Sequence, residues 1–534
     1  MIVDPTSLDT TFPSFVALCT IGGTKKGTYV LSRLRGMRKR FSIAVPGRVV
    51  SLAASLAALS FLAGCKPVGP NYTRPTYTAP PVYKEAGGPN VTAPPPNPDG
   101  GSWKPATPSD GMLKGKWWEI YNDPQLNALE ERIDVNNQAV KQAMETYLAA
   151  RDQVKSVRSQ LYPQFSAGPG YSYNRLSHHQ PDALPTTPTS FNDLLLTGSG
   201  SWEPDFWGKI RRSIEVARST MQADAALQAN VSLTLQAEMA ADYFQMRGLD
   251  SQIRLLKNTV ADLEQQLNLT ERRLNGGVAT DVDVAQAQTE LETVRAQLVD
   301  VSVARAQFEH AIGTIANYTL SNFSIPFAPL DLTLPNVPLG VPSQLLERRP
   351  DIAAAERQAQ AANAQIGVAI SAYYPTITLN GAGGFQSTHG GTWIQGPSAL
   401  WSLGASATEL LFDAGQRHAL TDQAKHLYEA QAAGYRNTVF SAFQDVEDNL
   451  STLRTLNEEE AVEKRAVDAA QHSLDLSNQR YKGGVTSYLE VITAETTLLA
   501  DQRILTDLQT RQFADSVQLV RSLGGGWDAS QLPK

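Results

Sequence analysis

Few residues of this chain have the type and spacing that chemistry requires. There are two cysteines and seven histidines in 534 residues. Cys65 directly follows an uncharged, mostly apolar stretch at 49–63, where its thiolate could form a thioether. The alternative for Cys65 is an ordinary buried core cysteine. His178 and His179 are adjacent, but no carboxylate or cysteine cluster accompanies them, so we predict no metal site.

Catalytic motifs are absent from the sequence. There is no Walker loop, no Gly-x-Ser-x-Gly elbow, no His-Glu-x-x-His and no Cys-x-x-Cys. We therefore expect that the protein is not an enzyme and needs no cofactor.

The N-terminal region has the order of a secretory signal. Basic residues at 38–40 and 48 precede the apolar stretch, which ends in Leu62-Ala-Gly-Cys65. This ending resembles the bacterial lipobox, in which the cysteine is lipidated and becomes the first residue. Residues 1–64 are then an upstream extension plus signal peptide, with Met37 as the expected start. Cys19 would be absent from the mature chain, which leaves no disulfide.

The mature chain would be acidic. The whole sequence has 46 basic and 53 acidic residues, of which eight and two lie in residues 1–64, so 38 and 51 remain and the formal charge is −13. That balance argues against nucleic acid as a partner. Residues 65–115 form the predicted lipid anchor and an extended segment, because twelve prolines lie between 66 and 110. Lys66 after the cysteine favours export to the outer membrane.

The remainder is an internal duplication. Leu161–Phe165 resembles Tyr373–Ile377, and Arg273–Val278 resembles Arg480–Val485. Glu203–Gly208 likewise resembles Glu409–Gly415. We predict a first repeat at 116–325, a linker at 326–342, a second repeat at 343–525 and a tail at 526–534.

Each repeat has the same predicted plan. A helical segment, Leu126–Leu161 or Ser343–Tyr373, precedes two strands and two long helices. No proline occurs from Asp205 to Ile325 or from Ser398 to Leu532, as long helices require. Gly208–Asn275 as one helix would be roughly 100 Å long. The predicted strands are Gln164–Arg175, Leu194–Glu203, Thr376–Gln386 and Leu400–Leu410.

The long helices carry heptads and meet at paired glycines. Apolar residues recur at spacings of three and four before and after each Gly-Gly pair, which predicts antiparallel coiled-coil hairpins. Gly276-Gly277 and Gly483-Gly484 would supply left-handed helix caps. Thr280 or Asp281 would cap the returning helix in the first repeat, and Ser487 in the second. The heptad residues are Ile253, Leu256, Val260, Leu263, Leu267, Leu274, Val284, Ala287, Leu291, Val294, Leu298 and Val301, then Val467, Ala470, Leu474, Tyr481, Val491, Ala494, Leu498, Leu505 and Leu508.

The predicted strands alternate apolar and polar residues. In 164–175, Phe165, Ala167, Tyr171 and Tyr173 share one side. Such runs suit a transmembrane β-barrel, and they suit a half-buried soluble sheet equally well. Four strands cannot close a barrel, and open strand edges in lipid are costly, so a membrane sheet requires several copies of the chain.

Several motifs together resemble one family. They are Trp117-Trp118, Asp123–Leu126, Val68–Pro75 and Leu345–Ile352. With the duplication and the lipobox, they resemble the outer-membrane efflux proteins, the TolC/OprM family, and within it the NodT-type lipoproteins of RND tripartite pumps. The resemblance implies a mixed α+β membrane fold. It would be a trimeric β-barrel with four strands per protomer, continuous with a long periplasmic α-helical coiled-coil barrel and an equatorial domain.

The resemblance also implies a function and partners. The protein would be a passive homotrimeric channel in the outer membrane, held there by lipid on Cys65. It would carry small molecules delivered by an inner-membrane RND pump through a periplasmic adaptor protein. The pump and adaptor would set the cargo, which the sequence does not name.

Site residues follow from the family's use of its hairpin tips, which are Arg273–Asp283 and Arg480–Glu490 in this sequence. The expected adaptor contacts are Arg273, Gly276, Gly277, Val278, Arg480, Gly483, Gly484 and Val485. The candidates for the pore gate are Asp281, Asp283, Glu490, Thr493 and Thr496. Related channels often carry aspartate and arginine where Thr493 and Thr496 stand, so we expect weaker ionic closure here.

A second hypothesis needs no channel. A structural envelope lipoprotein could use a coiled coil as a spacer and would share the lipobox and the heptads. It would need neither four membrane strands nor paired Gly-Gly tips.

Overall fold

The computed structural model of the chain describes residues 66–77, 79–80, 82–86, 91–92, 115–177, 190–339 and 342–533. Residues 1–64, Cys65, His178 and His179 therefore lie outside the described residues. The elements in chain order are β1 Val91–Thr92, η2 Trp117–Tyr121, α2 Pro124–Asn136, α3 Gln138–Ser159, β2 Gln164–Arg175, β3 Ser190–Trp202, α4 Lys209–Asn275, α5 Asp281–Ile315, η3 Leu320–Asn322, β4 Val337–Pro338, η4 Pro342–Gln344, α6 Leu345–Arg348, α7 Pro350–Ser371, β5 Thr376–Ser387, η5 Gly390–Thr392, η6 Gly396–Ser398, β6 Ala399–Thr408, α8 Gln416–Lys482, α9 Tyr488–Ser522 and η7 Ala529–Gln531.

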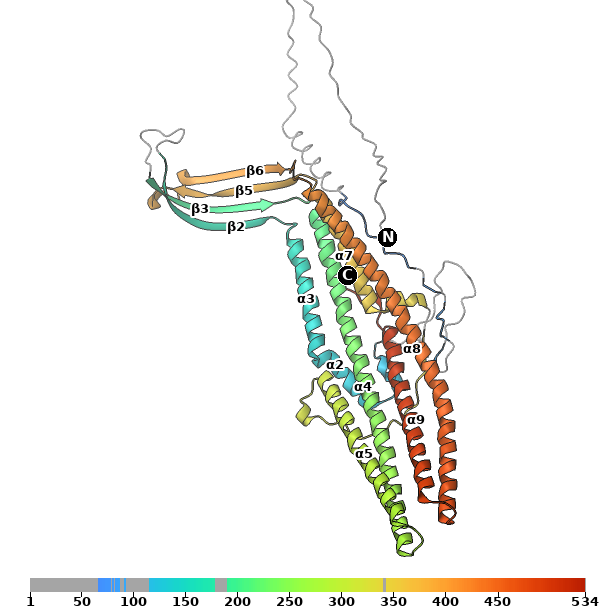
Figure 1. Ribbon diagram of the computed structural model, residues 1–534. Coiled ribbons are helices and arrows are strands. Elements are labelled where there is room, and N and C mark those ends of the chain that lie inside the picture. The colour runs from blue at the N-terminus through green and yellow to red at the C-terminus, as the bar shows by residue number, and fades with distance from the viewer. Residues whose placement is uncertain are drawn as a thin grey trace, which may run out of the picture. The chain divides into compact units, whose positions relative to one another are not determined.

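The duplication is visible in the helix lengths. Helices α4 and α8 have 67 residues each, and α5 and α9 have 35 each. The predicted single helix at 208–275 is confirmed. Figure 1 shows both antiparallel hairpins, α4 with α5 and α8 with α9, and their turns lie at the end away from the sheet.

The two shorter helical predictions were wrong in detail. The predicted helix at 126–161 is two helices, because Asn137 is extended and its carboxamide oxygen caps α3 by accepting from Ala139 and Val140. Its Nδ2 group donates to the Ile315 carbonyl oxygen at 2.8 Å. The predicted helix at 343–373 breaks at Arg349, since the residue before a proline avoids the helical region.

Four strands form one antiparallel sheet. Their order is β2-β3-β5-β6, so the two repeats meet between β3 and β5. The predicted strand at 164–175 is confirmed at both ends. The second strand, β3, begins at Ser190, four residues earlier than predicted, because it pairs with every residue of β2. The third and fourth lie within two residues of their predicted ends.

The register of the sheet separates an apolar face from a polar face. Tyr171 lies opposite Leu194, and Trp202 opposite Leu379, on the same face as the alternating apolar residues of β6. On the other face, Ser166 and Ser199 share a hydrogen bond of 2.9 Å. The large apolar side chains are exposed in the single chain, including Phe165, Trp401 and Leu403. A half-buried soluble sheet would instead cover this face.

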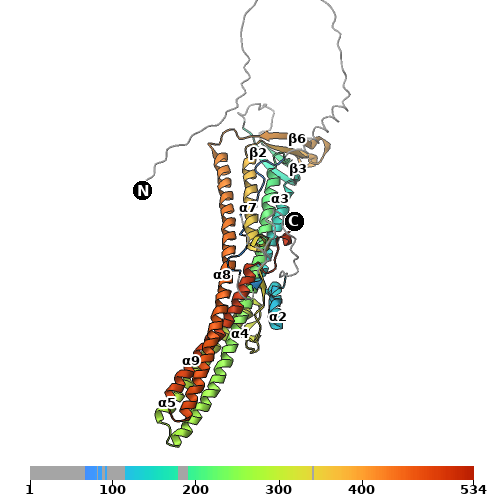
Figure 2. The same ribbon diagram turned by 90° about the vertical axis from the view of Figure 1, so that its right-hand side faces the viewer.

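The helices pack lengthwise around α4. It contacts α3 and α7 near the sheet, and α5 and α9 further along, while α8 packs on α7 and α9 (Figures 1 and 2). Of the helices that the structure describes, none has the length and apolar character needed to cross a bilayer.

The largest core lies midway along the helices. Tyr121, Phe244 and Phe513 bring η2, α4 and α9 together, with ring centroids 4.8–6.4 Å apart. The Tyr121 hydroxyl shares a 2.8 Å hydrogen bond with Ser516. Gly248 allows α4 to approach Thr510 of α9 so closely that a Cβ atom would collide with it. The core therefore joins the two hairpins as well as the helices within each.

A buried ionic cluster fixes the linker between the repeats. Asp250 is fully buried and accepts from Arg305 at 2.6 Å and from Arg247 at 3.2 Å. The Ala328 backbone N–H donates to it at 3.0 Å. Arg247 and Arg305 also donate to linker carbonyl oxygens, those of Pro326 and Ile325. One carboxylate thus holds two helices and the linker.

Replacing this carboxylate tests the cluster. Asp250→Asn should destabilise the protein by about 3–5 kcal/mol, because Arg247 would keep its buried positive charge without a counter-ion and Arg305 would keep only Glu309. The midpoint of thermal unfolding in detergent, followed by circular dichroism, should fall markedly. Asp331→Asn is the matched control, since the exposed pair of Asp331 with Arg254 should contribute only ~0–1 kcal/mol. Equal midpoints for the two variants would contradict a central role for Asp250.

Candidate functional site

Each hairpin turns through the same backbone motif. Gly277 and Gly484 are left-handed, each with φ of +72°. In the first turn, Val278 N–H donates to the Arg273 carbonyl oxygen and Gly277 N–H to that of Leu274. The second turn repeats both bonds, from Val485 to Arg480 and from Gly484 to Tyr481. This is a complete Schellman motif, and it confirms the predicted left-handed caps.

The returning helices start differently in the two repeats. Thr280 caps α5 through its hydroxyl, which accepts from the Asp283 N–H, while the Asp283 carboxylate accepts from the Thr280 N–H. Asp281 stands in the same first turn and is exposed. Ser487 occupies the cap position of α9, as predicted, but its side chain makes no capping bond. The start of α5 at the first tip is therefore held by side-chain hydrogen bonds that the start of α9 at the second tip lacks.

Apolar side chains project from both tips. Val278 and Val282 in the first turn match Val485 and Leu489 in the second, and each is more than half exposed. Contiguous exposed apolar residues mark interaction sites on soluble surfaces. The same pattern at matching positions of both repeats makes the two tips one candidate docking surface.

Within one chain the two tips lie against each other. The Arg273 guanidinium donates to the Tyr481 carbonyl oxygen at 3.1 Å and lies 4.4 Å from the centroid of its ring. Tyr481 in turn packs on Tyr488 with ring centroids 5.3 Å apart. Arg480 at the second tip pairs with Glu490 at 3.1 Å, and both are exposed. Arg273 is thus the tip residue that ties the first hairpin to the second.

A mostly uncharged network continues this contact into the helices. Gln266 of α4 accepts a hydrogen bond from the Tyr488 hydroxyl at 3.2 Å and donates to Glu495 at 3.4 Å. The Thr496 hydroxyl donates at 2.8 Å to the Ile492 carbonyl oxygen of its own helix and lies 3.3 Å from a carboxylate oxygen of Glu290 in α5. Burial raises the pKa of Glu495 to about 7, against the effect of the bond from Gln266. The nearby carboxylates of Glu290 and Asp262 raise it further.

The gate candidates have separate roles. Asp283 belongs to the capping box, and Glu490 to the pair with Arg480. Thr493 is exposed and bonds only back to its own helix, at the Leu489 carbonyl oxygen. Thr496 also bonds back to its own helix, at the Ile492 carbonyl oxygen, and its hydroxyl oxygen lies 3.3 Å from Glu290 of the other hairpin. Among the described residues, no aspartate–arginine pair joins the hairpins at Thr493 and Thr496.

The sequence reasoning missed Gln266, Tyr488 and Glu495 as site residues. A signal existed, because Tyr488, Val491, Glu495 and Leu498 follow the spacing 3-4-3 and so put an acid on the packed stripe of α9. The structure buries Glu495 at that position, with 6% of its surface exposed.

Hydrogen bonds hold the extended N-terminal segment along the helices. The Arg212 side chain donates to the carbonyl oxygens of Val68 and Gly69, each at 3.1 Å. Val68 N–H donates to the Trp207 carbonyl oxygen at 3.0 Å, directly below the sheet. The chain then runs along α8, where the backbone N–H of Lys84 donates to Glu447 at 2.8 Å. The residues that follow the predicted anchor cysteine are therefore fixed at the foot of the sheet.

Comparisons with known proteins agree with this architecture. The sequence profile of the family described as "Outer membrane efflux protein" matches residues 129–317 and 341–525. The toluene efflux pump outer membrane protein TtgF of Pseudomonas putida is 31% identical over 90% of this chain and 97% of its own length. The probable outer membrane lipoprotein SilC of Salmonella typhimurium is 28% identical over 89% and 98%. The solved outer-membrane channel OprN superposes with a TM-score of 0.77 at 25% identity, covering 86% of this chain and all but 1% of that one.

The buried carboxyl of Glu495 predicts a pH dependence at the tips. The folded protein holds this proton more tightly than the unfolded chain, so stability is full below the ordinary pKa of 4.5 and falls as the pH rises to about 7. Amide hydrogen exchange in the first turns of α9 should accelerate over that range. The loss is on the order of 3 kcal/mol at most.

Glu495→Gln should flatten this profile, because an amide does not titrate. Glu271→Gln, at an exposed position of α4, serves as the control and should leave the profile unchanged. A wild-type exchange rate that is constant from pH 4.5 to 7, after correction for intrinsic exchange, would refute the assignment.

Proposed function

The chain belongs to the outer membrane efflux protein family, and on that premise we propose a passive trimeric conduit with adaptor-docking tips and a lipid anchor on Cys65. The protein is an outer-membrane channel of an efflux pump, not an enzyme. The trimer, the adaptor and RND pump, the gate and the anchor are the proposed parts.

The observation that carries the trimer is the open sheet. Strands β2 and β6 end the four-stranded order and have no further partner strand within the described residues. The apolar face suits a bilayer, but unpaired backbone groups in hydrocarbon cost several kcal/mol each. Joining β6 of one copy to β2 of the next removes both edges. Three copies would give a closed barrel of about twelve strands, within the range of bacterial outer-membrane barrels.

Exposed surface on helix α3 and on the segment between β6 and α8 supports the same contact between neighbouring copies. Of the 22 residues of α3, only Val140 is buried in the single chain. Leu411 and Phe412, between β6 and α8, are among the most exposed large apolar residues that the structure describes. These surfaces flank the two open edges of the sheet. A neighbouring copy would cover both edges and apolar residues together.

The tips are proposed to dock a periplasmic adaptor. The paired apolar patches of Val278, Val282, Val485 and Leu489 offer contact area, and the Schellman turns give each patch a defined shape. Of the expected contact residues, Val278 and Val485 are 68% and 73% exposed. Arg273 contributes by holding the tips together rather than by facing a partner. Gly277 and Gly484 set the turn through their left-handed conformation, whereas Gly276 and Gly483 have φ values that other residues adopt.

The gate is proposed to close without an ionic lock. The hydrogen bonds of Gln266 with Tyr488 and Glu495 would keep the two hairpins together, and Thr496 lies in contact with Glu290 beside them. Such bonds contribute about 1 kcal/mol each, so an adaptor could separate the hairpins at moderate cost. Asp281, Asp283 and Glu490 remain candidates for an acidic ring that attracts cations at the mouth.

The anchor and the pump complete the proposal. Val68 and Gly69 are held at the foot of the sheet, which supports lipid on Cys65 at the inner surface of the outer membrane. The related SilC is named a lipoprotein. We assign the energy supply and the selection of cargo to an inner-membrane RND pump, since the sequence of this chain contains no Walker loop for nucleotide binding.

The assembled state distinguishes this function from that of an envelope spacer. Purified in mild detergent, the protein should have the mass of three copies and should conduct ions in planar bilayers. Leu411→Asp should reduce the trimer fraction, because it puts a charge at the proposed joint, whereas Leu411→Met should not. A stable monomer without conductance would contradict the channel assembly and favour the spacer.

The turn geometry supplies a second test, on docking. In Gly277→Ala with Gly484→Ala, each new side chain meets no neighbour within 4 Å, but it must adopt φ of +72°. That strain is about 1–2 kcal/mol for each residue. Binding of the purified cognate adaptor should weaken by roughly 5–30-fold for each strained turn.

The adjacent glycines provide the matched control. Gly276→Ala with Gly483→Ala adds the same atoms at φ of −81° and −76°, which alanine adopts freely. This control should bind the adaptor normally and should support efflux in a deletion strain. Equal affinities of both pairs would show that the turn shape does not matter for docking.

A further inference from the structure

The apolar face of the sheet contains a hollow of about 640 Å³. Its floor is a block of four glycines in the two central strands. Gly198 lies opposite Gly383, and Gly200 opposite Gly381, all on the apolar face. Glycine weakens a strand interior and marks places where another group approaches the backbone closely. Four of them in adjoining registers leave a patch of bare backbone in the middle of a lipid-facing surface.

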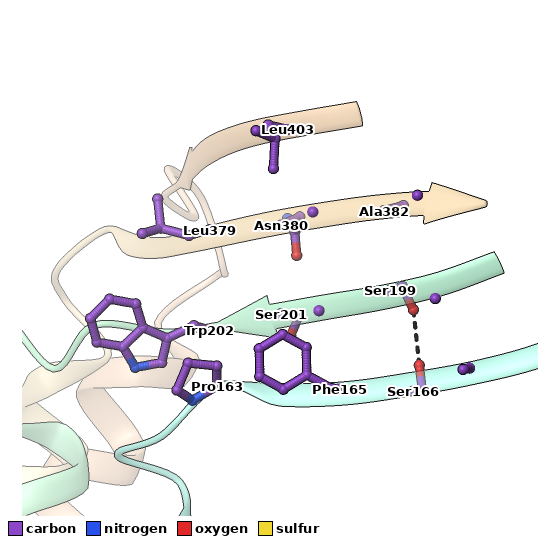
Figure 3. A pocket seen from close by; sticks show the side chains of 15 residues that line it. Pro163, Phe165, Ser166, Ser199, Ser201, Trp202, Leu379, Asn380, Ala382 and Leu403 are labelled. Atoms are coloured by element: carbon purple, nitrogen blue, oxygen red, sulfur yellow. Dashed lines mark hydrogen bonds between the residues drawn. The ribbon is translucent and has the colours of Figure 1, made fainter. Parts of the chain in front are cut away.

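Large apolar side chains wall the hollow. Phe165 leans over Gly200 from β2, and Leu403 leans over Gly381 from β6. Trp202 and Leu379, opposite each other, close the end nearest the helices, as Figure 3 shows. The group that fits is therefore apolar and slender. A hydrocarbon chain has these properties.

The N-terminal chain leads to this end of the sheet. Val68 is bonded to Trp207, whose indole N–H donates to the Pro375 carbonyl oxygen at 2.8 Å. Strand β5 begins at the next residue, and Leu379 lies about 13 Å further along it at ~3.3 Å per residue. Cys65 is bonded to Lys66, so the two Cα atoms are about 3.8 Å apart. A lipid on Cys65 is thereby tethered below the hollow.

We propose that one acyl chain of the lipid on Cys65 lies in the hollow between Phe165 and Leu403. This rests on the lipidation of Cys65 proposed above. A membrane lipid chain spans one leaflet, about half of the ~30 Å hydrocarbon core, which matches the distance from Pro375 to the hollow. The chain covers the glycine floor and fixes the N-terminal segment to the sheet.

The tether selects this occupant over a free phospholipid. A phospholipid chain has the same chemistry but arrives from the bilayer. A short covalent link gives the anchor a high effective concentration at one site. The hollow lies over the central strands β3 and β5, so closing the barrel through β2 and β6 leaves it open to this chain.

Photochemical cross-linking in intact outer membranes tests the occupant. The full-length protein carries p-benzoylphenylalanine in place of Leu403, or in place of Tyr173 at the far end of the same face. After illumination and proteolysis, mass spectrometry identifies the cross-linked partner. We expect the lipidated Cys65 peptide at position 403 and only phospholipid at position 173.

A filling variant removes the site. Gly198→Leu adds a side chain to the floor, where its Cβ atom would meet no atom closer than 3.9 Å, and the Cys65 cross-link at position 403 should be lost. Gly168→Leu makes the same substitution on the polar face of the sheet, and this variant should keep the Cys65 cross-link at position 403. Gly383→Leu replaces Gly198→Leu if that variant does not assemble.

The intact mass of the protein separates the two levels of the proposal. If Cys65 carries lipid but position 403 captures only phospholipid, or if both positions capture the anchor equally, the acyl site is refuted and the anchor stands. If the mass shows an unmodified Cys65, both the anchor and the acyl site are refuted.

Discussion

Hydrogen bonding of the backbone in hydrocarbon is the constraint on which this architecture depends. A sheet that faces lipid on one side must pair every strand, and the chain supplies four strands with two open edges. The register places large apolar residues of all four strands on one face, among them Tyr171, Trp202, Leu379 and Trp401. Repetition of the chain is then the means of closing the sheet, and the exposed residues at Leu411 and Phe412 lie where such closure would bury them.

The long helices α4, α5, α8 and α9 are subject to a different constraint, because they must lie alongside one another and be joined in pairs. Two 67-residue helices with two 35-residue partners achieve this through duplication of one pattern. The joints are tightest where the helices meet the linker. There the fully buried Asp250 holds Arg247 and the partly buried Arg305, and Gly248 lets α4 and α9 come into close contact. The two hairpins and the linker are therefore tied together in the middle of the helices.

The contacts that join the two hairpins near their tips are weaker than those in the middle of the helices. Arg273 reaches a carbonyl oxygen and an aromatic ring, and Gln266 links Tyr488 to Glu495 through bonds of 3.2 and 3.4 Å. None of these contacts is a buried ion pair, whose loss costs several kcal/mol. The charged groups at the tips are exposed, as in the pair of Arg480 with Glu490, whereas Asp250 in the middle is fully buried. The contacts between the hairpins are therefore weaker at the tips than in the middle of the helices.

The sequence by itself determined the periodic features. Heptads, proline-free stretches, alternating strands and Gly-Gly turns predicted the hairpins, the four strands and the left-handed caps, because each depends on residues close together in the chain. Tertiary structure decided the rest. The break at Asn137 depends on a bond to Ile315, and the early start of β3 depends on its pairing with β2. The link from Gln266 to Glu495 and the glycine floor of the sheet join residues more than 180 positions apart. No local pattern encodes such contacts, since they arise only when packing and register bring distant segments together.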